Sequence, residues 1–181
     1  MKHYDQQQLI TRFAQLGYQW PKFHLIGTRS KADVPDAFDD VFYLIDGIQM
    51  HVYTGTTNPG VYWQQNFGTK KGVAVLKPGQ YIDTWVLGLH HGDYTAWTQA
   101  KPLTVYRDGD KDGKSEAGPI EETGMFGINI HRAHEAHTST VVAKWSAGCG
   151  VFNNPVEFNE FITLSKKTGQ KFFTYTLLDE F

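Results

Sequence analysis

The chain has 181 residues, a length typical of one domain, and 17 Lys and Arg against 19 Asp and Glu give a formal net charge of −2. This balance argues against a nucleic-acid partner, which needs a clustered basic surface. Hydrophobic residues make up 40% of the chain, which suffices for a packed core, and no apolar run is long enough to span a membrane. The 18 glycines and the 14% of aromatic residues favour short strands joined by tight turns over a helical bundle.

The N-terminal segment predicts a short helix. Asp5 is a capping residue with Gln8 three positions later, and Gly17 ends the segment. The apolar residues between them recur at helical spacing: Leu9, Ile10, Phe13 and Leu16. We therefore expect residues 1–20 to form an N-terminal helical appendage.

Most of the remaining chain predicts strands, because aromatic and β-branched residues alternate with Gly, Pro, Asn and Asp. The strongest hairpin signal is Asp46-Gly47. The expected strands are 23–28, 41–45, 48–54, 72–82, 84–89, 94–99, 103–106, 126–131 and 171–178. The sequence thus predicts one mostly β (α+β) domain over residues 1–181.

A second helix is expected near the C-terminus. Asn154 is its cap, Pro155 takes the first helical position and Glu157 completes a capping box. Phe158, Phe161 and Ile162 form its buried stripe, and Gly169 ends it.

Cys149 is the only cysteine, so the chain forms no internal disulfide and no cysteine-rich zinc site. It lies between Gly148 and Gly150, and the small flanking residues let backbone N–H groups approach a bound carbonyl. A buried structural thiol is the alternative, since free cysteines are commonly core residues.

His131 is the candidate base for this thiol. It ends an expected strand, and fourteen residues separate it from Ser146, enough for a loop that returns to the same place. His134 and His137 lie within that loop, where they are either metal ligands or exposed loop residues.

The stretch 127–152 resembles the active-site signature of the L,D-transpeptidase catalytic domain, the YkuD-like family. That pattern is a His, about 14 to 17 residues, Ser or Thr, a short variable position, Gly and Cys. It is matched by His131, Ser146, Gly148 and Cys149. The segment 54–60 is similar to a Thr-, Pro- and Gly-rich stretch of the family. The resemblance implies a β-sandwich or barrel, with a helix after the catalytic Cys.

The resemblance also implies cysteine-dependent acyl transfer on peptidoglycan stem peptides. Cys149 would attack the carbonyl of an L,D peptide bond, and His131 would take the thiol proton and return one to the leaving amine. The backbone N–H groups of Gly148 and Cys149 would hold the oxyanion, and Ser146 would fix the loop. The carbonyl of Arg132, or a nearby hydroxyl, would orient His131. No metal or organic cofactor is implied.

Substrate contacts are expected from Arg132, Trp145, Ala147 and Gly150. Two of these positions depart from the family pattern. Ala147 stands where the family often has His, and Gly150 and Val151 stand where it has an apolar residue followed by Arg or Asn. These departures leave open a catalytically silent wall-binding module of the same fold.

A zinc peptidase is a further alternative, with His91, Asp93 and His131 as ligands. The simpler interpretation of His90-His91-Gly92-Asp93 is a hairpin tip.

The run from Asp108 to Gly113 matches the first half of a calcium loop, with carboxylates at alternate positions. Its twelfth position is Pro119 where a bidentate Glu is required, and Glu116 is near but out of register. A solvated acidic turn is the favoured interpretation, and calcium binding stays open.

The N-terminal residues contain no apolar stretch typical of a secretory signal. We expect synthesis in the cytoplasm and action at the bacterial cell wall, as a phage lysis or tail enzyme or as a delivered effector. A monomer acting on peptidoglycan stem peptides is the expected form.

Overall fold

The computed structural model describes residues 1–181 and is built around a closed barrel of eight strands. In chain order the elements are α1 (Gln6–Leu16), β1 (Phe23–Arg29), β2 (Asp40–Asp46), β3 (Gln49–Thr56), α2 (Val61–Gln65), β4 (Val73–Leu76), β5 (Gly79–His90), β6 (Tyr94–Gln99), β7 (Leu103–Asp108), β8 (Ile120–Gly124), β9 (Ile130–Arg132), β10 (Gly150–Phe152), α3 (Pro155–Lys167) and β11 (Phe173–Asp179). The mostly β fold class is therefore confirmed.

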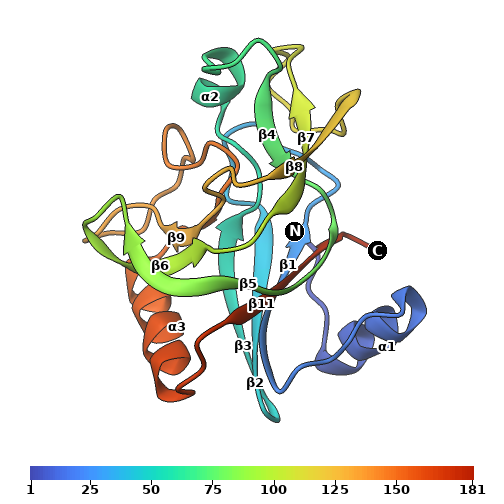
Figure 1. Ribbon diagram of the computed structural model, residues 1–181, viewed down its shortest axis with the longest axis vertical. Helices are drawn as coiled ribbons and strands as arrows, with labels where there is room; N and C mark the ends of the chain where they lie inside the picture. The colour runs from blue at the N-terminus through green and yellow to red at the C-terminus, as the bar shows by residue number, and fades with distance from the viewer.

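Around the barrel the strand order is β1-β11-β5-β6-β9-β10-β3-β2, and a separate sheet has the order β4-β7-β8. Two neighbouring pairs are parallel, β1 with β11 and β9 with β10, and the other barrel pairs are antiparallel. Figure 1 shows the small sheet and α2 at one end of the molecule, with α1 and α3 on opposite sides of the other end.

The main core lies inside the barrel and is closed by α3. Phe152 of β10 packs against two rings of that helix, with centroids 5.6 Å from Phe158 and 5.1 Å from Phe161. Trp97 of β6 is fully buried and donates its indole N–H to the Ser165 hydroxyl at 3.1 Å. Helix α3 is thus part of the core beneath β9 and β10.

Helix α1 packs on the outside of the barrel, as its apolar face predicts. Its expected capping box is present, with the Asp5 carboxylate accepting the Gln8 N–H at 2.8 Å. Leu9 and Phe13 are buried in a second cluster, against outward-facing side chains of β1 and β2 such as Ile26. The appendage therefore covers one face of the barrel.

The cap of α3 differs from the prediction. Asn154 does cap the helix, accepting the Val156 N–H at 2.9 Å, but Glu157 does not close a capping box. Its carboxylate lies beside the backbone N–H of Thr54 on β3. A partner on a neighbouring strand has replaced the local one.

Three predicted strands are divided differently in the structure, and other limits shift by one or two residues; the predicted strand 84–89 is part of the long β5. The segment 72–82 splits between β4 and β5, at Pro78, which has no N–H to donate to a ladder. Of the segment 126–131, only the end belongs to β9. The N–H groups of Phe126 and Ile128 both donate to Gln99 Oε1 at 3.0 Å, so a side chain satisfies them instead of a strand.

The predicted hairpins at Asp46-Gly47 and at residues 90–93 are present, joining β2 to β3 and β5 to β6. Among the helices, none combines the length and the apolar character that crossing a membrane requires.

Docking of α1 can be tested with Phe13→Ala. Because Phe13 is 1% exposed and packs edge-on to Trp20 at 4.9 Å, the truncation should lower the free energy of unfolding by about 3–5 kcal/mol. Urea unfolding followed by tryptophan fluorescence measures it. The exposed Gln15→Ala on the same helix is the control and should change stability by less than about 0.5 kcal/mol. Equal stability of the two variants would mean that α1 is not docked.

Candidate active site

Cys149 and His131 are placed by the short parallel pair β9–β10. Val151 lies opposite His131 in the register, and the Gly150 N–H donates to the Asn129 carbonyl at 3.0 Å. Side chains alternate along a strand, so Cys149, Val151 and the opposite His131 share the outer face, whereas Phe152 points into the barrel. Cys149 comes directly before β10 and His131 lies opposite Val151, so the two predicted catalytic residues belong to the same strand pair, and no hydrogen bond joins them.

The loop before Cys149 is held by Ser146, which is fully buried. The Ser146 hydroxyl donates to the Cys149 carbonyl at 2.9 Å and accepts the Gly148 N–H at 3.2 Å. The predicted role of this hydroxyl in fixing the loop is thus present in the structure. The segment predicted to be similar to the family's Thr-, Pro- and Gly-rich stretch also reaches the loop, because Gly60 donates its N–H to the Ser146 carbonyl at 2.9 Å.

Position 148 requires glycine for a steric reason. Its φ is +120°, and a Cβ there would lie 2.3 Å from the carbonyl oxygen of Ala74 on β4. The Cys149 loop therefore rests directly on the small sheet.

The expected oxyanion pocket is only partly free. The Gly148 N–H is engaged by Ser146, as described above, whereas the Cys149 N–H has no partner within the chain. One donor is therefore available for a developing negative charge, and a second becomes available only if Ser146 releases Gly148.

The Cys149 thiol is half-buried and stays protonated at neutral pH. Its Sγ accepts the Asn129 N–H at 3.4 Å and donates to the Gly127 carbonyl at 3.5 Å. Burial raises the pKa of Cys149 to about 11, against the smaller opposing effect of the Asn129 N–H. Cys149 at rest is therefore a thiol and not a thiolate.

His131 is buried and neutral, with a defined tautomer. Burial and the neighbouring His90 lower the pKa of His131 to about 3. Its Nδ1 lies 2.8 Å from the Arg132 carbonyl oxygen. A carbonyl oxygen can only accept a hydrogen bond, so Nδ1 must be the donor and carries the hydrogen. Nε2 therefore keeps its lone pair and makes no hydrogen bond in the chain. The predicted orienting group, the Arg132 carbonyl, is the one found.

Two aromatic residues from the β5–β6 hairpin support this imidazole, and the sequence did not indicate either in this role. The Tyr94 hydroxyl donates to the Arg132 carbonyl at 3.2 Å and lies 3.4 Å from His131 Nδ1. The His90 ring stacks on His131 with centroids 4.0 Å apart. Asn129 Nδ2 lies 3.1 Å from Nδ1 of His90. Contacts this distant in sequence leave no local signal.

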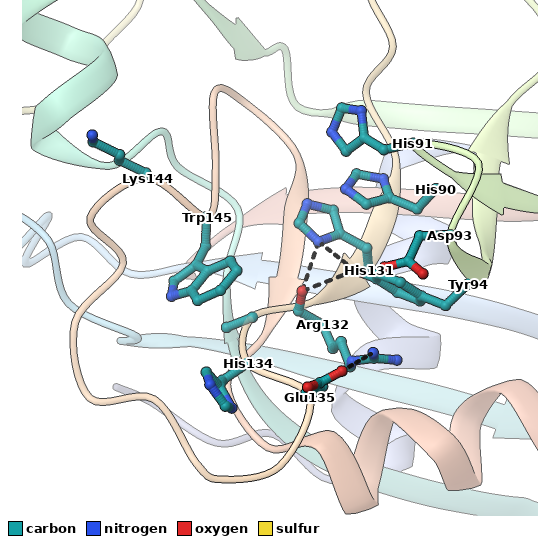
Figure 2. Close-up of a pocket in the computed structure, with 11 residues that line it drawn as sticks. His90, His91, Asp93, Tyr94, His131, Arg132, His134, Glu135, Lys144 and Trp145 are labelled. Atoms are coloured by element: carbon teal, nitrogen blue, oxygen red, sulfur yellow. Dashed lines mark hydrogen bonds and ion pairs between the residues drawn. The ribbon is translucent and has the colours of Figure 1, made fainter.

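A cavity of about 460 Å³ opens beside this group. Figure 2 shows His90, His91 and His131 along one side of it, with Trp145 and Lys144 on the other. Arg132 also lines the cavity, with its guanidinium 3.8 Å from the centroid of the Tyr94 ring. Two of the predicted substrate contacts, Arg132 and Trp145, thus line this space, and Lys144 adds a second cation.

The other two predicted contacts lie elsewhere. Ala147 lines a second cavity of about 300 Å³, together with Phe126 and Trp63. The Cys149 loop therefore runs between two cavities, with Trp145 in one and Ala147 in the other. Gly150 lines neither cavity: a Cβ at this buried position would lie 2.7 Å from Ile130 Cδ1, so packing explains this glycine.

The geometry does not support the zinc hypothesis. The ligand atoms of His91, Asp93 and His131 do not all lie within 4.8 Å of one another. Among the His, Cys, Asp and Glu side chains, one group of three meets this condition: Asp110, Asp112 and Glu116. His134 and His137 stack on each other at 3.6 Å in the loop between β9 and β10, outside any such group.

Comparison of the chain with protein-family models, curated proteins and solved structures gives no match. The function of the protein is therefore inferred from the residues of this site and from the resemblance carried by 127–152.

The protonation state of Cys149 predicts slow alkylation at neutral pH. With a pKa of about 11, the thiolate fraction at pH 7 is about 100-fold below that of a thiol with a pKa near 9, and the rate should rise about tenfold per pH unit up to pH 10. Iodoacetamide labelling followed by intact-protein mass spectrometry measures this. A rate that is already level below pH 8 would show a thiolate–imidazolium pair at rest and contradict the prediction.

Proposed function

We propose that this protein is a cysteine acyl-transfer enzyme that acts on peptidoglycan stem peptides, in the manner of L,D-transpeptidases. The observation that carries the proposal is the β9–β10 register, which brings Cys149 onto the same face as a His131 whose Nε2 is unprotonated and free. A thiol and a neutral imidazole with a fixed tautomer are what base-assisted attack on a carbonyl requires.

The first step transfers the thiol proton. His131 Nε2 takes the proton from Cys149 Sγ as Sγ bonds to the carbonyl carbon of the scissile peptide, so that thiolate forms only as the attack proceeds. The carbonyl oxygen becomes an oxyanion that the Cys149 N–H can hold. A resting pair without charge fits the raised pKa of the thiol and the lowered pKa of the imidazole.

The second step expels the amine. As the C–N bond breaks, His131 Nε2 returns its proton to the leaving nitrogen, and a weakly basic imidazole gives this proton up readily. The acyl group then remains on Cys149 Sγ as a thioester. An amine acceptor resolves this thioester into a crosslink, and water resolves it into a cleaved peptide.

The two cavities supply places for the two sides of such a reaction. The larger one is lined by Arg132, whose guanidinium lies 3.9 Å from the Glu135 carboxylate and suits a carboxylate of a stem peptide. The Lys144 ammonium instead lies over the Tyr62 ring, at 4.2 Å. The second, beside Ala147, is more apolar, with Trp63 and Phe126. A peptide that crosses the Cys149 loop would place one segment in each.

The decisive experiment is a muropeptide profile by mass spectrometry. Purified sacculi are incubated with the wild-type chain, Cys149→Ala and His131→Ala. New products should form with the wild type and decrease by about 10³-fold or more in both variants, because nucleophile and base are removed. His137→Ala, a change of an exposed loop residue, is the control and should leave the products unchanged.

Each other outcome removes the proposal. If Cys149→Ala produces as much product as the wild type, Cys149 is not the nucleophile. If no variant changes the sacculi but all sediment with them, the silent wall-binding module replaces the enzyme.

Ser146→Ala tests the loop that presents the nucleophile. Removing the buried hydroxyl leaves the Gly148 N–H and the Cys149 carbonyl without this partner, and should lower the free energy of unfolding by about 1–3 kcal/mol. Displacement of Cys149 should also lower the rate of product formation by about 10- to 100-fold at a temperature where the variant is fully folded. Thr138→Ala, in an exposed part of the same chain segment, is the control. An unchanged rate would show that Ser146 does not position Cys149.

A further inference from the structure

The connection between β7 and β8 gathers four carboxylates. We call residues 108–116 the acidic loop. Asp108 ends β7, Asp110 and Asp112 follow at alternate positions, and Gly113 has a φ of +92°. Ligand atoms of Asp110, Asp112 and Glu116 all lie within 4.8 Å of one another. Calcium binds oxygen ligands at about 2.3–2.6 Å, so ligands on opposite sides of the ion lie up to about 5 Å apart.

The buried carboxylate of Asp108 points independently to a ligand. Asp108 is 5% exposed, and its Oδ2 is buried with no hydrogen-bond partner. It lines one cavity together with Asp110 and Glu116, although its oxygens lie outside the group of three that are all within 4.8 Å of one another. A buried carboxylate oxygen without a partner is costly, and a cation is the group that would satisfy it here.

No side-chain cation of the chain neutralises these carboxylates in an ion pair. The nearby Lys71 and Arg107 both pair with Glu122 on β8, and the Lys111 ammonium lies over the Phe67 ring at 5.1 Å. The carboxylates of Asp110 and Asp112 instead accept backbone N–H groups, from Asp112 at 3.0 Å and from Lys114 at 2.8 Å.

We propose that the acidic loop binds one calcium ion. Hard carboxylate oxygens on an irregular loop suit calcium, whereas magnesium demands a small and nearly ideal octahedron. Glu116 takes part from the ninth position, which corrects the sequence-based view that it is out of register. Because Pro119 stands at the twelfth position, the bidentate ligand is missing and we expect weak binding, with Kd of about 10⁻⁴ to 10⁻³ M.

The acidic loop is tied to the rest of the chain, so binding should stabilise the fold. Gln64 of α2 donates its side-chain N–H to the Lys114 carbonyl at 2.8 Å, and the Ser115 N–H donates to the Asp33 carboxylate at 2.9 Å. These contacts hold the loop in place before an ion arrives. This inference does not depend on the proposed acyl transfer.

The test uses the full chain, stripped of metal with a chelator that is then removed. Equilibrium dialysis against 2 mM CaCl₂ should give about one bound calcium per chain. Thermal unfolding in 10 mM CaCl₂ should occur about 3–10 °C higher than without it, and 10 mM MgCl₂ should shift it by less than a third as much. The double variant Asp110→Asn, Asp112→Asn should lose both the bound ion and the shift.

Asp83→Asn is the matched control, since Asp83 is another exposed acidic residue with a left-handed backbone, φ +50°, that lies outside the loop. It should retain the full calcium shift. Dialysis of the wild-type chain decides the question even if the double variant fails to fold. The proposal is overturned by wild type that binds no calcium, by a shift that survives in the folded double variant, or by equal shifts with magnesium and calcium.

Discussion

The arrangement of the site depends on one short contact, the parallel pairing of β9 with β10. Each strand has three residues, and together they join β6 to β3 and so close the barrel. A Cβ at Gly150 would lie 2.7 Å from Ile130 Cδ1, so the two paired residues pack closely. Because alternate residues face opposite ways, the same pairing that sends Phe152 into the core leaves His131 and Cys149 on the outside. The strand pairing that closes the barrel therefore also brings the two candidate groups toward each other.

Burial determines the charge state of this pair. Both side chains are held by backbone groups, the thiol by Asn129 and Gly127 and the imidazole by the Arg132 carbonyl, and both are neutral at rest. A partly desolvated thiol and imidazole cannot separate charge without a compensating donor, because the low local dielectric penalises both ions. A substrate carbonyl that accepts the Cys149 N–H and shares the developing charge is such compensation. If the proposed acyl transfer is correct, the thiol stays unreactive until such a carbonyl is bound.

Local sequence signals were sufficient for elements whose partners are local. The α1 capping box and the hairpin at Asp46-Gly47 are specified by adjacent residues, and both are present as predicted. Signals failed where a distant group decides the outcome. Gln99 takes the N–H groups that 126–128 would have offered to a strand, and β10 is too short to show a pattern of its own.

The same distinction applies to the site. Cys149, Ser146 and His131 are indicated by their spacing in one stretch of the chain, whereas Tyr94 and His90 reach His131 from another hairpin. The His90 ring stacks on His131, and the Tyr94 hydroxyl and His131 Nδ1 both contact the same carbonyl. Both contacts depend on the pairing of β5 with β6 and on how that hairpin meets β9. No periodicity in residues 90–94 encodes this. Motif spacing can therefore suggest candidate catalytic groups, but the groups that set their pKa and tautomer require the fold.

The small sheet links the acidic loop to the loop that carries Cys149. Asp108 is paired with Val73 across β7 and β4, and the next residue on β4 is Ala74, whose carbonyl lies against Gly148. The carboxylates at the end of β7, which repel one another, therefore lie only a few residues from the part of β4 on which the Cys149 loop rests. A cation that neutralises them would stabilise the β4–β7 ladder and, through it, the support of Gly148. Because the contact at Gly148 leaves no room for a side chain, small displacements of β4 must be followed by the loop, and the position of Cys149 then depends on how firmly that sheet is held.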